Sequence, residues 1–292
     1  MSSWGDLFVF SGTAAILNMG GPVNQICAGR MDDADGTKSA PLDDPEGDCS
    51  VQGNCSEPLG ASTVGLIYVN PAGFLGDPVP SGSASQIRTV FGRMGMNDSE
   101  TVSLIGGGHA FGKCHGACTL GPGDGPDVDA ENPWPGNCGS GIAENTFTSG
   151  FEGAWTHTPL QWSNEYFQQL LYDNYSLWTG PGGNWQWENE QNGLMMLTTD
   201  LALVADDDYL QIVEDFADDI DALNAAFAAS WQKLVESGNA TQWADNKFCV
   251  DATTLATEYV ATSTEEPNES GAAQSVYILV TVLVAAAFTF FQ

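Results

Sequence analysis

The sequence predicts a mainly α-helical fold with long loops and few strands. Three segments, at 97–109, 163–171 and 220–234, carry the start signals or the apolar periodicity of helices. Two stretches, at 29–60 and 121–141, are rich in Asp, Gly, Pro and Ser and show little periodicity, which is typical of surface loops. We therefore expect a helical domain that long loops interrupt.

The first helix signal is a capping box. The Asn97 side chain can accept a hydrogen bond from the backbone of Glu100, whose carboxylate can accept one from the backbone of Asn97. Apolar residues follow directly, so a helix is expected to start here. His109 falls late in this helix.

The other two helices are expected from their apolar side chains. The helix after Ser163 carries Phe167, Leu170 and Leu171. The last pattern is the clearest, with apolar side chains at steps of three and four: Ile220, Leu223, Phe227, Trp231 and Leu234. Acidic residues at its start and Lys233 near its end suit the helix dipole, and Gly238 is expected to stop the helix.

The chain is strongly acidic, which excludes one class of partner. It has 292 residues, and 42% of them are apolar, which is ordinary for a chain that buries a core. Its 38 acidic residues against 7 Lys and Arg give a formal net charge of −31, which repels nucleic acid. We expect no nucleic-acid partner and interpret the dispersed carboxylates as a solvated surface.

Cysteines and glycosylation sequons both fit an oxidising compartment. Disulfides are expected among the seven cysteines, although the sequence leaves their pairing open: Cys27, Cys49, Cys55, Cys114, Cys118, Cys138 and Cys249. Five sequons are compatible with a secreted glycoprotein: Asn54, Asn97, Asn174, Asn239 and Asn268. We expect the protein to be secreted or held at the cell surface.

The end of the chain carries a membrane-type signal. The stretch 276–291 is almost entirely apolar and is shorter than the roughly 20 residues of a spanning helix. Ser270, Gly271 and Ala272 are small residues before it, which favours a glycolipid-anchor signal. A tail anchor that stays in the membrane is the second interpretation, and a buried helix is the third.

Candidate chemistry centres on the few histidines, which are His109, His115 and His157. A single histidine near a helix end is more often structural than a ligand. Before His109, however, stand three glycines, 106–108, and glycine inside a helix is unfavourable. We interpret the three glycines as room for a large flat group close to His109.

Six motifs resemble those of catalase-peroxidases, in that family's order from Ser3 to Gly238. The run at 100–117, ETVSLIGGGHAFGKCHGA, resembles the family's proximal helix. The others are SWGDLFVF at 3–10, GLIYVNP at 65–71, the segment from IR at 87 to MGMND at 94–98, TSGFEGAWTHTP at 148–159 and MLTTDL at 196–201. The resemblance implies part of the haem-peroxidase fold and a haem b cofactor that contains iron.

The resemblance also implies roles for individual residues. His109 would ligate the haem iron, Asp200 would accept the proton of its other ring nitrogen, and Trp155 would donate its indole N–H to the same carboxylate. Ser149 matches a serine near a haem propionate, and His115 matches a histidine at the haem edge. The three glycines Gly106, Gly107 and Gly108 are assigned to the cofactor side of the helix.

Tyr68 and Met94 match two members of a Met-Tyr-Trp adduct with which the family oxidises a second peroxide. The third member is absent, and so is the family's distal Arg-x-x-Trp-His motif, because no Trp-His pair occurs in the sequence. Ser237 occupies the position of the family's mobile arginine. We therefore expect slow peroxidase turnover, and essentially no catalase turnover, from this chain alone.

Without the resemblance, ordinary interpretations stand beside these assignments. Trp155 reads as a core aromatic residue, Asp200 as a helix cap and Met94 as helix packing. The CHGAC run at 114–118 could be part of a zinc site, but it lacks a fourth ligand at metal-like spacing, so we favour disulfides there.

The sequence as a whole predicts a haem-peroxidase domain over 1–238, a polar linker over 239–272 and an apolar tail over 273–292. The expected function is a haem peroxidase of the catalase-peroxidase type, acting on hydrogen peroxide and an unidentified electron donor. A homodimer is the expected assembly. Ascorbate peroxidase ranks below it because that family lacks the YVNP loop. A non-catalytic, surface-anchored haem-binding or structural glycoprotein is the alternative.

Overall fold

The computed structural model describes residues 3–32, 69–116, 148–180, 184–236 and 243–252. Within them lie seven α-helices: α1 (Trp4–Asn18), α2 (Pro80–Arg93), α3 (Asp98–His109), α4 (Glu165–Tyr172), α5 (Thr198–Ala205), α6 (Asp207–Asp218) and α7 (Ile220–Glu236). A short 3-10 helix, η1 (Phe74–Gly76), precedes α2. The expected mainly α-helical class is confirmed.

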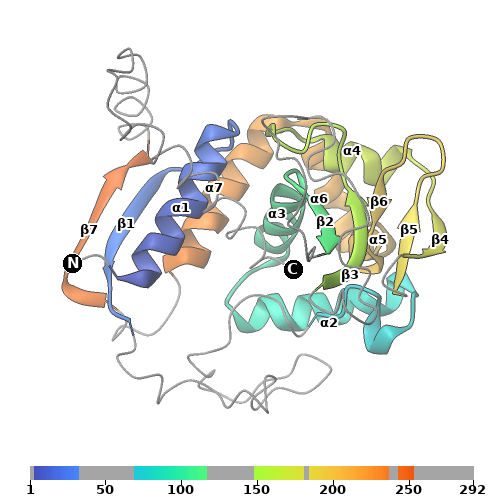
Figure 1. Ribbon diagram of the computed structural model, residues 1–292, viewed down its shortest axis with the longest axis horizontal. Helices are drawn as coiled ribbons and strands as arrows, with labels where there is room; N and C mark the ends of the chain where they lie inside the picture. Colours follow the sequence, from blue (N-terminus) through green and yellow to red (C-terminus); the bar gives the residue numbers. More distant parts are fainter. Residues whose placement is uncertain (1–2, 33–68, 117–147, 181–183, 237–242, 253–292) are drawn as a thin grey trace.

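The strands are short and form three small antiparallel sheets, one at each side of the view in Figure 1 and one beside the helices in its middle. The pairs are β1 (Gln25–Arg30) with β7 (Trp243–Asp251), and β2 (Lys113–Gly116) with β3 (Thr148–Ala154). The third sheet has the order β4 (Ser176–Thr179), β5 (Trp185–Glu188) and β6 (Met195–Met196). Because Gly29 and Arg30 belong to β1, the loop expected from residue 29 starts later than predicted.

Helix α3 lies in the middle of the fold and packs against α4, α6 and α7 (Figure 1). The capping box is present as predicted, since Asn97 Oδ1 accepts the Glu100 N–H and Glu100 Oε2 accepts the Asn97 N–H, both over 2.8 Å. The helix ends at His109. The predicted capping box therefore sets the start of the helix, and His109 falls late in it, as expected.

Helix α7 presents the predicted apolar stripe to the core. Leu223, Phe227 and Trp231 are buried, and Leu234 packs on them at the edge. Ile220 is 37% exposed, because it is the first residue of the helix and lies before the part of α7 that packs on the core. Lys233 pairs with the Glu100 carboxylate, which joins the end of α7 to the start of α3.

An arginine fastens α2 to two neighbouring helices. Arg88 donates to both carboxylate oxygens of Asp98, at the start of α3, and to both of Asp206, which caps α6. The hydrogen bonds from Arg88 are the main cause that lowers the pKa of Asp206 below its usual value. Bidentate arginine–carboxylate hydrogen bonds fix the relative orientation of the two groups, so they hold the start of α3 in a defined position against α2.

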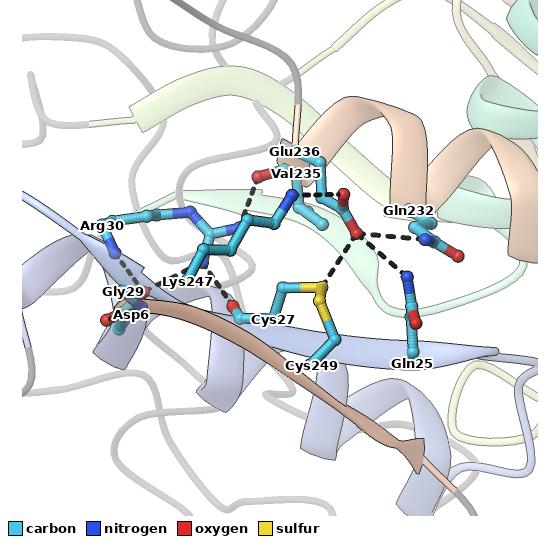
Figure 2. The surroundings of a disulfide bond; sticks show 10 residues. All are labelled: Asp6, Gln25, Cys27, Gly29, Arg30, Gln232, Val235, Glu236, Lys247 and Cys249. Atoms are coloured by element: carbon cyan, nitrogen blue, oxygen red, sulfur yellow. Dashed lines mark hydrogen bonds and ion pairs between the residues drawn. A yellow bond between two sulfur atoms is a disulfide. The ribbon is translucent and has the colours of Figure 1, made fainter. Parts of the chain in front are cut away.

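The two ends of the described chain meet at the β1–β7 pair. Cys27 lies opposite Cys249 in the register and forms a disulfide with it (Figure 2). Beside it, Arg30 pairs with the Asp6 carboxylate of α1 and donates to the Val235 carbonyl of α7. These contacts tie α1, α7 and both strands together.

No helix in the described part of the chain is long and apolar enough to cross a membrane. Residues 243–251 of the predicted linker form β7 and pair with β1, so this part is a strand of the fold rather than a linker. The rest of the predicted linker, apart from Ala252, and the apolar tail lie outside the described residues.

We predict that removing the Cys27–Cys249 bond lowers the free energy of unfolding by about 2–4 kcal/mol, because the bond restricts the unfolded chain. Cys27→Ser, Cys249→Ser and the double variant should lose the same amount in urea unfolding, since each breaks the same bond. Additive losses from the two single variants would show that the cysteines act separately.

Candidate functional site

The buried carboxylate of Asp200 is the centre of the candidate site. It has no exposed surface and lies in the first turn of α5. Oδ1 lies 2.8 Å from His109 Nδ1 and 2.7 Å from the Tyr166 hydroxyl. Oδ2 accepts the Trp155 indole N–H over 2.8 Å and the Leu197 backbone N–H over 2.7 Å. Each oxygen therefore has two donors.

The four donors keep this carboxylate ionised. Burial acts to raise the pKa of Asp200, but electrostatic attraction to His109 and hydrogen bonds from His109, Tyr166 and Leu197 outweigh it, so the pKa lies below the usual value. A buried charge is tolerated only when its lone pairs are satisfied in this way. At neutral pH Asp200 is consequently an acceptor only.

His109 is held so that one ring nitrogen faces outward. Because ionised Asp200 can only accept, Nδ1 carries a proton, and in a neutral imidazole the lone pair is then on Nε2. No described residue forms a hydrogen bond with Nε2, and 23% of the His109 side chain is exposed. The ring stacks on Trp155, with centroids 4.0 Å apart and planes 10° from parallel. Nε2 is thus available to a metal ion.

The site assembles from four separate elements. His109 is the last residue of α3, Trp155 directly follows β3, Tyr166 lies in α4 and Asp200 in α5. The structure therefore brings together His109, Trp155 and Asp200, which the resemblance to catalase-peroxidases placed in one trio. The helix-cap interpretation of Asp200 is also satisfied, because the same carboxylate accepts the N–H of Leu197.

The interpretation of the three glycines was wrong for two of them. A Cβ on Gly106 would lie 2.1 Å from the ring of Phe167, and a Cβ on Gly107 would lie 2.2 Å from the ring of Phe227. These glycines make room for aromatic rings of α4 and α7, and leave none for a cofactor. A Cβ on Gly108 would meet nothing within 4 Å, so only Gly108 adjoins open space.

The other predicted site residues are not brought to the trio by the described structure. Met94 follows α2 and packs, partly buried, against the core. Tyr68 and Ser237 lie outside the described residues, so the predicted approach of Tyr68 to Met94 stays a prediction. His115 lies on β2 and Ser149 on β3, and only their backbone is described. Their assigned roles stay predictions as well.

Tyr166 is a site residue that the sequence analysis missed. It lies on the buried face of α4, beside Phe167 and Leu170, which the analysis did identify as apolar. A tyrosine on such a face needs a partner for its hydroxyl, and this was the available signal. Burial, followed by the charge of Asp200 and the bond to it, raises the pKa of Tyr166 well above its usual value.

The two disulfide cysteines and Glu236 together resemble a metal-binding group. Ligand atoms of Cys27, Glu236 and Cys249 lie within 4.8 Å of one another. In Figure 2 the two sulfurs are bonded together and Glu236 is engaged by Lys247, Gln232 and Gln25. The 3.1 Å approach of Glu236 to Cys27 is a contact rather than a hydrogen bond, because a disulfide sulfur carries no proton. The sulfurs are therefore not thiolate ligands here.

The structure does not support a zinc site at the CHGAC run. The disulfide that we favoured in this run is wrong for Cys114, which is a buried free thiol. Burial, then the charges of Asp200 and Glu152, raise the pKa of this thiol well above the usual value. A protonated thiol is a poor metal ligand. The second cysteine of the run, Cys118, lies outside the described residues.

Two cavities open elsewhere on the surface. One, of about 340 Å³, is bordered by Asn70, Phe151 and Trp185, and the other, of about 430 Å³, by Tyr172 and Glu214. His109 lines neither of them. The candidate site therefore rests on the donor atoms around His109 rather than on the shape of a pocket.

A histidine that a buried carboxylate holds by one nitrogen, with the other nitrogen open, is an arrangement in which histidines commonly ligate a metal centre. Comparison with known proteins gives the family. Residues 1–219 match the family described as "Peroxidase", and the chain belongs to this family.

The relatives are catalase-peroxidases. The chain is 41% identical to those of Natronomonas pharaonis, over 268 residues, and Salinibacter ruber, over 259 residues; each alignment covers 80% of this chain and 36% of the relative. It is 38% identical over 273 residues to that of Escherichia coli, covering 84% of this chain and 37% of that protein. The chain thus spans little more than a third of the length of these relatives, and the predicted resemblance is confirmed.

We predict opposite effects of alanine at two glycines of α3. Gly106→Ala should lower the free energy of unfolding by about 1–3 kcal/mol, because the new methyl group overlaps the Phe167 ring. Gly108→Ala, the matched control, should raise the free energy of unfolding by up to about 1 kcal/mol, because alanine favours the helix and its methyl group meets no atom within 4 Å. Urea unfolding measures both, and equal losses would contradict this account of the glycines.

Proposed function

We propose that this chain binds haem b through His109 and that the protein acts as a peroxidase of the catalase-peroxidase type, reducing hydrogen peroxide with electrons from a donor. The observation that carries the proposal is the His109–Asp200–Trp155 arrangement. Membership of the peroxidase family and the similarity to catalase-peroxidases support it. Neither comparison favours a non-catalytic surface glycoprotein.

The residues present fit a haem group on three counts. Nε2 of His109 has its lone pair free, because the Nδ1 proton is committed to Asp200. The ring is partly exposed, so a ligand can reach Nε2. Gly108, directly before His109, adjoins open space. Bound haem supplies an iron centre at which the O–O bond of a peroxide is cleaved.

The protein's part is to set the character of the iron ligand. The Nδ1–H bond to ionised Asp200 gives the imidazole partial anionic character, which makes Nε2 a stronger electron donor. The Trp155 indole donates to the other oxygen of the same carboxylate and stacks on the imidazole, so it fixes both the carboxylate and the ring plane. Asp200 therefore orients His109 and increases its basicity.

Peroxidase chemistry also needs proton transfer and charge stabilisation at the peroxide. A base would take the peroxide proton, and a cation would stabilise the departing oxygen; each such group typically contributes about 10²-fold or more in rate. The sequence of this chain holds no Trp-His pair of the kind that the family uses. We therefore propose that this chain alone turns peroxide over slowly.

We predict that the full chain, reconstituted with haem, shows the absorption spectrum of a histidine-ligated haem and only slow, peroxide-dependent oxidation of a chromogenic donor. His109→Ala should abolish both. His157→Ala is the matched control, because His157 is a surface histidine paired with Glu165 and should change neither.

Two results would contradict the proposal. Haem binding that survives His109→Ala would remove His109 as the ligand. A loss of histidine ligation in His157→Ala that equals the loss in His109→Ala would show that the assay does not report on this site.

We also propose a location. The acidic surface, the seven cysteines and the apolar segment at 276–291 favour a secreted or cell-surface protein with a glycolipid or tail anchor. Release of the native protein from cells by a phospholipase that cleaves glycolipid anchors would support the first type, whereas retention after this treatment would favour the second. Assembly as a homodimer stays a prediction.

A further inference from the structure

Tyr166 is the donor to Asp200 that a His-Asp-Trp arrangement does not require. Its hydroxyl lies 2.7 Å from Oδ1, the oxygen that also lies 2.8 Å from His109 Nδ1. Trp155 donates to the other oxygen. We propose that Tyr166 is a positioning residue that shares Oδ1 with His109 and so limits how strongly Asp200 holds the Nδ1 proton of His109.

The competition follows from the chemistry of one oxygen. A carboxylate oxygen that accepts one short hydrogen bond has less charge to offer a second donor, and a low-dielectric interior enlarges the effect. Asp200 and Tyr166 both have no exposed surface, so water has no access through which to replace the tyrosine. The strength of the His109–Asp200 bond therefore depends on the Tyr166 hydroxyl.

The surrounding packing holds that hydroxyl in place. Phe167, the next residue of α4, fills the space over Gly106 of α3. The Tyr166 ring also meets the His109 ring edge to face, with centroids 5.7 Å apart. Since these contacts fix α4 against α3, the hydroxyl of Tyr166 and Nδ1 of His109 reach Oδ1 from two rigidly related helices.

With haem bound, this arrangement would moderate electron donation from His109, a step that rests on the proposed function. A weaker Nδ1–H bond leaves the imidazole less anionic and the iron less electron-rich. Tyr166 would thus keep the reduction potential of the iron higher than the same site would give with phenylalanine at this position.

The first test uses the full chain without haem. Tyr166→Phe should strengthen the His109–Asp200 bond and move the Nδ1–H proton resonance of His109 downfield in NMR spectra at constant pH. Tyr209→Phe is the matched control, since Tyr209 is fully buried in α6 and its hydroxyl finds no partner among the described residues. It should leave the resonance in place. The resonance is assigned by its loss in His109→Gln.

A second measurement strengthens the hydrogen bond from the Tyr166 hydroxyl instead of removing it. Incorporation of 3-fluorotyrosine makes the phenol a stronger donor, so the His109 resonance should move upfield in the wild-type chain. The same labelling in Tyr166→Phe should have no such effect, which assigns the change to Tyr166 among the seven tyrosines.

The third measurement uses the haem-loaded chain. Tyr166→Phe should raise the iron–histidine stretching frequency in resonance Raman spectra and lower the reduction potential, while Tyr209→Phe changes neither. An unmoved or upfield His109 resonance in folded Tyr166→Phe overturns the inference whatever the chain does with haem. If the chain shows the expected NMR shifts but binds no haem, the inference that Tyr166 and His109 share Oδ1 stands and the proposed function is refuted.

Discussion

The structure depends on satisfying one buried charge. Asp200 has no contact with solvent, and an ionised carboxylate in such a place is tolerated only with a full set of donors. Its donors come from the end of α3, from α4, from the residue after β3 and from the backbone just before α5. The site therefore forms only when all four segments have docked, which makes its assembly part of folding.

Helix α3 meets this constraint by being fixed along its whole length. Its start carries the capping box and the Lys233–Glu100 pair, and its last turn accepts the rings of Phe167 and Phe227 through two glycines. Its last residue, His109, is held by Asp200. A helix fixed at its start and in its last turn can place its final side chain with little freedom, as a metal ligand needs.

The sequence predicted the features that local pattern controls and missed those that depend on packing. The capping box at Asn97 and the apolar stripe of α7 follow from neighbouring residues, and both are present. The packing of the Phe167 ring against Gly106 could not be predicted, because the two residues belong to different helices. The trio itself came from a resemblance to a family, since no spacing rule links residues 109, 155 and 200. Tyr166 was within reach of sequence reasoning, because a tyrosine on an apolar helix face needs an acceptor.

Two demands on Asp200 pull in opposite directions. Stability favours as many donors as possible, because each one offsets part of the desolvation of the buried carboxylate. The proposed electron donation from His109 to haem iron would favour few, because every further donor takes charge that would otherwise strengthen the bond to Nδ1. The structure places two of the donors, Trp155 and the Leu197 backbone, on Oδ2, away from the histidine. Only Tyr166 competes with His109 directly for Oδ1. Its single hydroxyl group therefore both stabilises the carboxylate and limits the basicity of the histidine.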